Sequence, residues 1–189
     1  MSIPLFPFAR RDPRRLRRAG ITFVELAVSI TVMVFALCAA ASTVITTGAL
    51  NQKNHETEVA RRAAENMIEV LRNTAFEKVF PTYNAAPADD PNGAGTAPGN
   101  LFAVTGLTPI AGAPGGVCGT ILFPSAGPAL FENTNDPTLG MPRDLNADGV
   151  IDAANHIGDN RVLPVRIRIR WQSKNGPRTV ELSTLLSEL

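Results

Sequence analysis

Cysteine and histidine are scarce in this sequence, with two of each among 189 residues. Cys38 lies inside a long apolar run and Cys118 far outside it, so one chain cannot readily bridge them and we expect no intramolecular disulfide. The lack of a closely spaced cysteine pair excludes a cysteine zinc site. Neither His55 nor His156 has an evident nucleophile beside it, and no phosphate-binding loop is found. These absences argue against an enzyme.

Charge and proline are missing from much of the N-terminal part of the chain. No charged residue occurs from Leu26 to Gln52, and no proline between Pro13 and Pro81. The apolar part of this run, roughly residues 21–50, is longer than the about 20 residues that a helix needs to cross a bilayer. We therefore expect a transmembrane segment, or a signal that begins as one.

The residues before this run are strongly basic. Residues 1–20 contain six arginines and one acidic residue, Asp12. Such an excess of positive charge keeps the N-terminus on the cytoplasmic side of the membrane, so everything after Leu50 is expected to face outward. Without residues 1–20 the chain has 12 basic and 16 acidic residues, a formal net charge of −4, although the whole sequence has +1.

Glu25 stands at the start of the apolar run. A carboxylate there costs a few kcal/mol unless something pairs with it, so Glu25 is a candidate functional residue. Two ordinary targeting signals are alternatives: a secretory signal cut after the alanines at 39–41, and a lipoprotein signal at Cys38. Glu25 and the apolarity that continues past residue 41 disfavour the first. Leu37, where a small residue is needed, disfavours the second.

The residues around Glu25 resemble a known family. A basic leader ending in Gly20 is followed by Ile21-Thr22-Phe23-Val24-Glu25 and an unbroken apolar run. This pattern resembles the processing and methylation segment of type IV prepilins and type II secretion pseudopilins. The resemblance implies that prepilin peptidase cuts between Gly20 and Ile21 on the cytoplasmic side, removes the leader 1–20 and methylates the new amino terminus. It also implies other pilin or pseudopilin subunits as partners.

Glu25 lies four residues after the amino terminus that this cleavage would create. At about 1.5 Å rise per residue, its carboxylate is about 6 Å along the helix axis from the amine of Ile21. An α-amino group has an ordinary pKa near about 8 and stays cationic after methylation, so opposite charges become available. When helices pack with an axial stagger, Glu25 can instead meet the amine of a neighbouring subunit at low dielectric. A glutamate that only snorkels to the interface is the alternative.

The helical pattern continues beyond the membrane. Apolar residues at spacings of three and four form one stripe: Ala60, Ala63, Ala64, Met67, Ile68, Leu71, Ala75 and Val79. We therefore predict one helix over 21–80, with residues 21–50 in lipid or a filament core and residues 51–80 amphipathic. Pro81 is expected to end the helix, and Gly48 to be its softest point.

Residues 81–189 are expected to form an outer β domain that includes a long loop at 124–160. A surface loop follows Pro81, and residues 101–107 and 117–123 have the composition of strands. The predicted fold class is α+β, with a long N-terminal α-helix packed on a small antiparallel β-sheet. This arrangement also resembles the pilin fold.

The clearest strand signal is near the C-terminus. From Val165 to Trp171, apolar residues alternate with three arginines, which indicates a half-buried strand with the arginines on its solvated side. A turn centred on Asn175-Gly176 would place Trp171 opposite Val180 in a second strand. Because Pro177 cannot donate a hydrogen bond, we expect a four-residue loop with this register.

An acidic motif occurs in the 124–160 loop. The segment Asp144-Leu145-Asn146-Ala147-Asp148-Gly149-Val150-Ile151-Asp152 matches the opening of a calcium-binding loop. The predicted ligands are side-chain oxygens of Asp144, Asn146, Asp148, Asp152 and Asn155 and the carbonyl oxygen of Val150. Asn155 stands where a bidentate glutamate is usual, so the match is partial and resembles a dockerin-type or solitary calcium loop, which Asp159 can complete from outside. A structural calcium ion would order the loop, and an Asx-rich turn without an ion is the alternative.

These features favour a minor pilin or pseudopilin, a structural subunit of a type IV pilus or type II secretion pseudopilus. It would be a single-pass inner-membrane precursor with a cytoplasmic N-terminus and a periplasmic domain, assembled after leader cleavage. Nucleic acid is not an expected partner, because the mature chain is negatively charged and its arginines are not interleaved with exposed aromatic residues. The rival is a bitopic membrane-anchored protein with a calcium-dependent outer binding domain.

Overall fold

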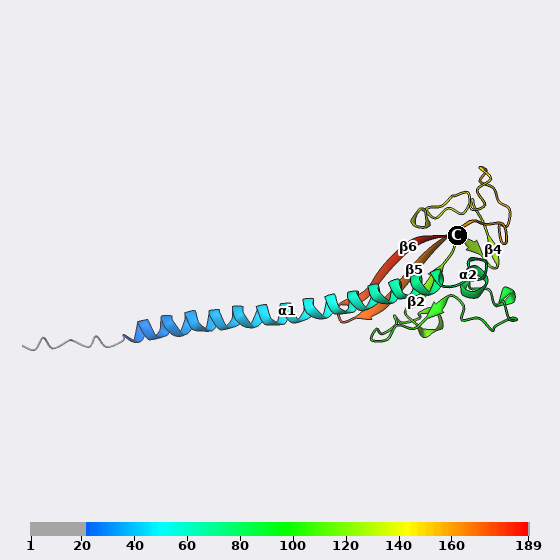
Figure 1. Cartoon of the computed structure of the whole chain (residues 1–189). Helices are drawn as coiled ribbons and strands as arrows, with labels where there is room; N and C mark the ends of the chain where they lie inside the picture. The colour runs from blue at the N-terminus through cyan, green and yellow to red at the C-terminus, as the bar shows by residue number, and fades with distance from the viewer. Residues whose placement is uncertain (1–21, 189) are drawn as a thin grey trace, which may run out of the picture. The chain divides into compact units, whose positions relative to one another are not determined.

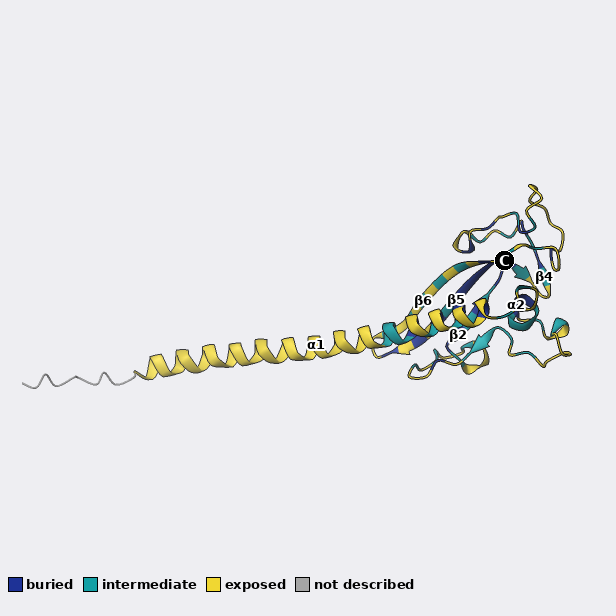
Figure 2. Cartoon of the chain, viewed as in Figure 1, coloured by how far each residue is buried: buried dark blue, intermediate teal, exposed yellow. Residues whose placement is uncertain are grey.

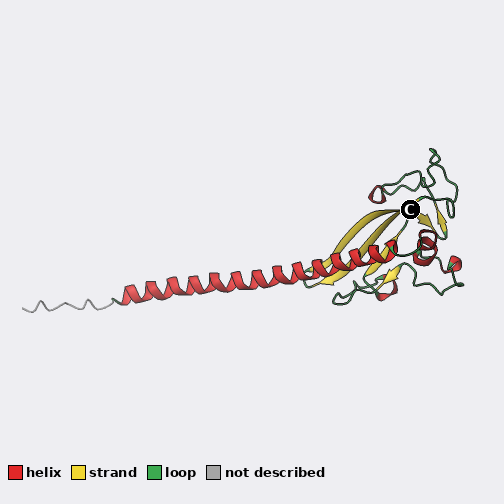
Figure 3. Ribbon diagram, in the orientation of Figure 1, coloured by secondary structure: helices red, strands yellow, loops and turns green. Residues whose placement is uncertain are grey.

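The computed structural model describes residues 22–188 (Figure 1). The chain divides into two units, Met1–Thr47 and Gly48–Leu189, which are described separately. The predicted α+β fold class is confirmed, since the chain combines a 50-residue N-terminal helix, α1 (Phe23–Arg72), with a four-stranded antiparallel sheet (Figure 3). The predicted cleavage site, Gly20 and Ile21, lies outside the described residues.

The elements after α1 are short helices and six strands. In chain order they are α2 (Phe76–Tyr83), η1 (Pro87–Asp89), β1 (Leu101–Phe102), η2 (Pro114–Gly116), β2 (Gly119–Leu122), β3 (Ser125–Ala126), β4 (Ala129–Leu130), η3 (Pro137–Leu139), β5 (Val162–Ser173) and β6 (Gly176–Ser187). The main sheet has the order β1-β2-β5-β6, and β3 pairs with β4 in a separate ribbon. The β5–β6 hairpin, with 12 residues in each arm, is therefore the main structure against which the other elements pack.

The second half of α1 packs on this sheet through one narrow stripe. Its buried residues are Ala60, Ala64, Ile68 and Leu71, at spacings of four, four and three, as the sequence predicted. They share one hydrophobic core with the inward side chains of β5, among them Ile167, Ile169 and Trp171. The two alanines allow a close approach of the helix to the sheet. Figure 2 shows this part of α1 changing from exposed to partly buried along its length.

The predicted single helix to residue 80 is wrong at its C-terminal end. α1 stops at Arg72, and Ala75, with φ −54° and ψ 131°, precedes a separate helix, α2. Phe80 explains the break: at about 100° per residue, a straight helix would turn it to the side opposite Leu71. After the break Phe80 is buried, and its ring meets that of Phe123 edge-on with 5.3 Å between centroids.

Pro81 does not end a helix, contrary to the prediction. It lies inside α2, which continues to Tyr83. Proline has no N–H, so the helical bond to the carbonyl of Glu77 is lost. The backbone N–H of Asn84 still donates to the carbonyl of Phe80 at 2.9 Å. One missing hydrogen bond near the end of a short helix is thus tolerated.

The β5–β6 hairpin forms with a register that differs by two residues from the prediction. Trp171 lies opposite Arg178 instead of Val180, and the turn contains two residues instead of four. Pro177 accounts for the difference, because it now stands opposite Gln172, whose N–H donates to a carbonyl on the other side of β5. At such a non-hydrogen-bonded pair the ladder needs no N–H from proline. A shift of two residues keeps every side chain on its predicted face.

We expected the arginine face of β5 to be solvated, but part of this face is covered. Arg166 is only 8% exposed, and its guanidinium lies 2.9 Å from a carboxylate oxygen of Asp136. Asp136 directly precedes η3, so part of the 124–160 loop folds over this face. Arg168 pairs with Glu181 of β6. A periodic pattern places the arginines on one face, but it does not show what covers that face.

Candidate functional site

The first half of α1 is an apolar helix with no buried residue. Every residue from 22 to 55 is exposed in the single chain, including Phe23 at 84% and Phe35 at 73% (Figure 2). This part of the helix is long and apolar enough to cross a membrane or to act as a signal. Since isolated apolar side chains favour lipid or protein over water, these residues require a partner surface of one of those kinds.

The polar groups of this apolar segment are satisfied within the helix itself. All six hydroxyl side chains between residues 26 and 50 donate to a backbone carbonyl three or four positions earlier: Ser29, Thr31, Ser42, Thr43, Thr46 and Thr47. An unpaired hydroxyl would cost free energy in lipid or in a dry bundle. The segment can therefore enter either environment without leaving these groups unpaired.

Glu25 lies in the first turn of α1 as the third helical residue. Thr22 precedes the helix, and its hydroxyl oxygen accepts a hydrogen bond from the backbone N–H of Glu25 at 3.2 Å. The sequence Thr22-Phe23-Val24-Glu25 is thus the S/T-x-x-E pattern of a capping box. Among residues 22–188, no side chain bonds to the Glu25 carboxylate.

The Thr22 cap engages the backbone N–H of Glu25, and the sequence analysis missed it. A carboxylate in the first turn is stabilised by the positive end of the helix dipole. The signal was present in the sequence, as threonine followed three residues later by glutamate before an apolar run. Helix capping and pairing with an amine are separate roles, and they differ in whether they need the negative charge.

The aspartate carboxylates of the acidic loop accept hydrogen bonds from the backbone N–H groups of the same loop. The two carboxylate oxygens of Asp144 accept from the N–H groups of Ala147 at 2.6 Å and Gly149 at 2.8 Å. Asp148 accepts from the N–H of Val150 at 2.8 Å. Gly149 has φ 88°, a conformation that glycine adopts without strain. These bonds form an Asx-rich turn, and its calcium content stays a prediction.

The remaining predicted calcium ligands are placed differently. Asn146 accepts from the N–H of Asp148 at 3.0 Å, within the loop. Asn155 accepts from the N–H groups of Leu130 at 3.1 Å and Ile157 at 3.3 Å, and so connects the loop to β4. Val150, whose carbonyl was a predicted ligand, and Asp152 are exposed. The side chain of Asp152 instead contacts a second group of residues.

Glu132 is the centre of that second group, and it is completely buried. Its Oε1 accepts hydrogen bonds from the N–H groups of Leu145 at 2.6 Å and Asn146 at 3.2 Å. Its Oε2 accepts from the N–H of Asp152 at 3.3 Å. A buried carboxylate needs such partners, because removing a charge from water is costly. Glu132 thereby ties the chain after β4 to both ends of the acidic motif.

His156 meets Glu132 and Asp152 at one point. Its Nε2 lies 3.1 Å from Asp152 Oδ1 and 3.7 Å from Glu132 Oε2, while its Nδ1 lies 3.3 Å from Asp159 Oδ2. The ligand atoms of Glu132, Asp152 and His156 all lie within 4.8 Å of one another, so this group can hold a metal ion. Of the six predicted calcium ligands, only Asp152 belongs to it.

The protonation of His156 reflects these neighbours. Burial acts to lower the pKa of His156, but hydrogen bonds to Asp152 and Asp159 and the charge of Glu132 outweigh it, so the pKa lies above its ordinary value. The pKa of Asp152 is lowered by a hydrogen bond from the N–H of Ala154 and another from His156.

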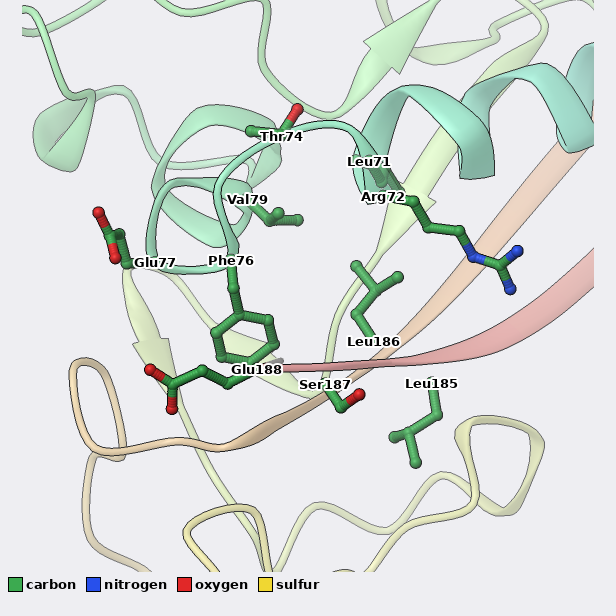
Figure 4. A pocket seen from close by; sticks show the side chains of 10 residues that line it. All are labelled: Leu71, Arg72, Thr74, Phe76, Glu77, Val79, Leu185, Leu186, Ser187 and Glu188. Carbon is green, nitrogen blue, oxygen red and sulfur yellow. The ribbon is translucent and has the colours of Figure 1, made fainter.

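A groove with a volume of about 550 Å³ lies where α1 ends, between α2 and the end of β6 (Figure 4). Leu71 and Leu186 line its apolar part, and Arg72, Glu77 and Glu188 bring charges to it. Figure 4 shows Leu185 and Leu186 on opposite sides of β6. The groove is a consequence of the helix break, which separates α1 from α2 above the last residues of β6.

The comparisons with known proteins yield no relative. No protein-family model matches the chain, and neither a curated protein nor a solved structure matches it. The pilin-like architecture, an N-terminal apolar helix joined to a globular β domain, therefore rests on the chain's own sequence and structure.

Proposed function

We propose that the chain is a minor pilin or pseudopilin, a structural subunit of a type IV pilus or type II secretion pseudopilus. The supporting observation is the division of α1 into an apolar first half, in which every side chain is exposed, and a second half that packs on an antiparallel sheet. Such a helix can anchor a precursor in the inner membrane. After extraction it can pack against copies of the same helix in a filament core.

Leader cleavage is the step that would commit the precursor to assembly. Prepilin peptidase would cut between Gly20 and Ile21, on the cytoplasmic side, and the domain after the membrane segment would be periplasmic. Other pilin or pseudopilin subunits would then supply the surfaces that cover residues 21–50. In water these apolar side chains would be unfavourable, so packing against neighbouring helices stabilises the assembled state.

Glu25 would direct this packing through its charge. In the proposed filament its carboxylate meets the amino terminus of Ile21, in the same or in a neighbouring subunit. The attraction strengthens at low dielectric, because fewer water dipoles screen the two charges. The exposure of the Glu25 side chain, which has no partner among residues 22–188, supports this proposal.

The N-terminal mass of the membrane-extracted protein tests the proposal. In cells with active prepilin peptidase, we expect a mature chain that begins at Ile21 and carries one additional methyl group. Cells without the peptidase provide the control and should contain the full chain. A protein that begins at Met1 or Ser2 in both strains would contradict the proposal and favour the bitopic membrane-anchored alternative.

The role proposed for the outer domain is structural and not enzymatic. His55 is exposed on α1, and His156 has carboxylates, not a nucleophile, as its partners. Cys118 is buried, and burial raises the pKa of its thiol, which disfavours the reactive thiolate. These environments support packing and loop organisation in place of catalysis.

Calcium is the ion that we propose for the acidic loop itself. Calcium prefers oxygen ligands, and the loop from Asp144 to Asp152 supplies several carboxylate, amide and carbonyl oxygens. Titration of the chelator-treated full chain in detergent with Ca²⁺ tests this. We expect binding that Asp144→Asn and Asp148→Asn remove and that His156→Gln leaves unchanged. Equal binding by Asp144→Asn and the unmodified protein would contradict it.

A further inference from the structure

The group formed by Glu132, Asp152 and His156 differs chemically from the calcium loop beside it. Two of its members are almost fully buried, Glu132 at 0% and His156 at 5% side-chain exposure, while the Asp152 side chain is 48% exposed. The group therefore has a fixed inner part and one side that is open to solvent.

The two ring nitrogens of His156 both face carboxylates, at 3.1 Å for Asp152 and 3.3 Å for Asp159. A neutral imidazole carries one proton, so it can donate to only one of them. If Nδ1 donates to Asp159, the lone pair of Nε2 points at oxygens of Asp152 and Glu132. Three electron-pair donors then converge, and either a proton on Nε2 or a metal cation between them removes their repulsion.

We propose that Glu132 Oε2, Asp152 Oδ1 and His156 Nε2 bind a divalent transition metal of the zinc class. Asp159 is then a positioning residue, because its bond to Nδ1 fixes the tautomer that leaves Nε2 free for the metal. Water would fill the remaining position on the exposed side. The proposal concerns the outer domain alone and does not depend on filament assembly.

The distances between the ligand atoms fit such an ion. Tetrahedral zinc with bonds of about 2.0–2.1 Å has neighbouring ligand atoms about 3.3 Å apart. The two distances from His156 Nε2, 3.1 Å to Asp152 Oδ1 and 3.7 Å to Glu132 Oε2, lie on either side of this value. All three ligand atoms lie within 4.8 Å of one another, so the longer separations have to shorten when the ion binds.

The ligand types select the class of metal. Calcium and magnesium take oxygen ligands, whereas imidazole suits zinc and its neighbours among the first-row metals. A ligand set of one imidazole and two carboxylates, without cysteine, favours a borderline divalent ion over Cu(I) and other soft ions. His156 therefore distinguishes this site from the acidic loop, although Asp152 belongs to both.

The bound metal would fasten the 124–160 loop at its two ends. Glu132 follows β4, whereas His156 lies 24 positions later, shortly before β5 begins. A metal that binds both closes this long loop and removes conformations from the unfolded chain. The loop also supplies Asp136, which covers Arg166 on the sheet. A metal at His156 would thus stabilise the cover on the arginine face of β5.

The test is a Zn²⁺ titration of the chelator-treated full chain in detergent, with Co²⁺ as a spectroscopic probe. We expect one Zn²⁺ per chain, retained in the presence of excess Ca²⁺, and visible absorption when Co²⁺ replaces it. Asp152→Asn and His156→Gln should abolish binding, and Asp159→Asn should weaken it by about 10-fold to 100-fold. Asp148→Asn is the matched control and should bind as the unmodified chain does.

Three results would overturn the proposal. The first is no Zn²⁺ binding by the unmodified chain, which would mean that the group holds a proton on His156 instead of a metal. The second is unchanged affinity in His156→Gln, and the third is an equal loss in Asp148→Asn and Asp152→Asn. Because Asp152 is exposed, its variant is expected to fold even if His156→Gln does not, and circular dichroism checks both.

Discussion

The two halves of α1 share one continuous helical backbone but differ in their surroundings. In the first half, apolar side chains occur on all sides and every residue is exposed. In the second half, charged side chains occupy the outer side, and a stripe from Ala60 to Leu71 is buried. The backbone therefore does not determine the role of each half. The distribution of side chains around the helix does, because it decides which surface can cover them.

The largest difference between the halves should appear when a leucine is truncated. Leu71→Ala removes a fully buried side chain and should lower the free energy of unfolding of the outer domain by about 2–5 kcal/mol. Leu37→Ala makes the same chemical change in the exposed first half and should leave that free energy unchanged. Denaturant titration in detergent, followed by the fluorescence of the single tryptophan, Trp171, measures both. Equal losses of unfolding free energy in the two variants would contradict the proposed difference in burial between the two halves of α1.

An introduced charge should have its larger effect in the first half of α1, where the leucine truncation has none. Val34→Arg places a cation near the middle of the apolar segment and should disfavour membrane insertion by about 3 kcal/mol. Val70→Arg makes the same substitution at an exposed position of the second half, and should alter neither insertion nor folding measurably. Alkaline extraction of membranes reports the inserted fraction. Normal insertion of the Val34 variant would argue against a transmembrane role for this segment.

A smaller effect is expected where the second half is hydrogen-bonded to the sheet. Glu56 accepts from the indole N–H of Trp171 at 3.0 Å, and Trp171 is only 1% exposed. Glu56→Ala leaves that buried donor unpaired, which should cost about 1–3 kcal/mol of unfolding free energy. Glu58→Ala is the matched control and should change little, because Glu58 pairs only with the exposed Arg61 and Arg62. Similar losses in both variants would contradict the assignment.

The contribution of Glu56 to the free energy of unfolding should decrease as the pH falls. Hydrogen bonds from Ser173 and Trp171 lower the pKa of Glu56 below its ordinary value of 4.5. A carboxyl group with a lowered pKa in the folded state stabilises the fold above the unfolded value, and this contribution is lost as the pH falls through the folded value. The stability difference between the unmodified protein and Glu56→Ala should therefore shrink progressively below pH 4.5. A gap that widens on acidification would contradict this sign.

The smallest effect is expected at the start of α1. Thr22→Ala removes the hydroxyl that caps the N–H of Glu25, and should destabilise the first helical turn by about 1 kcal/mol. Thr22→Ser keeps the capping oxygen and should behave as the unmodified protein does. Amide hydrogen exchange at Glu25 measures the difference. Equal exchange in all three proteins would mean that the cap contributes nothing to the helix.

The sequence was sufficient for the fold class and for the two halves of α1. Periodicity reports the environment directly, so the buried residues of α1, among them Ala64 and Ile68, all belong to the predicted stripe, whereas Ala75 of that stripe is exposed where the helix breaks. The hairpin strands were predicted for the same reason. Helices and strands whose buried residues recur at a regular spacing can be predicted from the sequence without knowing which elements they pack against.

Competing local signals account for the errors in the end of α1 and in the hairpin register. The end of α1 was assigned to Pro81, but the need to bury Phe80 against Phe123 breaks the helix earlier. The hairpin register was assigned from Asn175-Gly176, but Pro177 fits only a position at which the ladder requires no N–H. In the first case the deciding partner, Phe123, lies far outside the segment that gave the signal, and in the second the same proline is accommodated by a different register.

The candidate site was only partly predictable. The acidic motif was evident because its residues are contiguous. The hydrogen bonds that Asp144 accepts come from backbone N–H groups of the same motif. Glu132 could not be found in this way, since it lies 12 positions before Asp144 and 24 before His156. Its role depends on how the loop folds back past β4. Gly20 and Ile21 stay predictions of the resemblance, because they lie outside the described residues.

The most direct test of the proposed assembly mechanism is the amount of Glu25→Gln subunit in filaments sheared from cells. Glutamine leaves the Thr22 cap in place but removes the charge, so this variant tests the interactions that need the charge, which are the attraction to the amino terminus and the interaction with the helix dipole. We expect normal cleavage after Gly20 and a reduction of about tenfold or more in assembled subunit, which corresponds to about 1.4 kcal/mol or more. Assembly equal to that of the unmodified protein would contradict a steering role for the Glu25 charge.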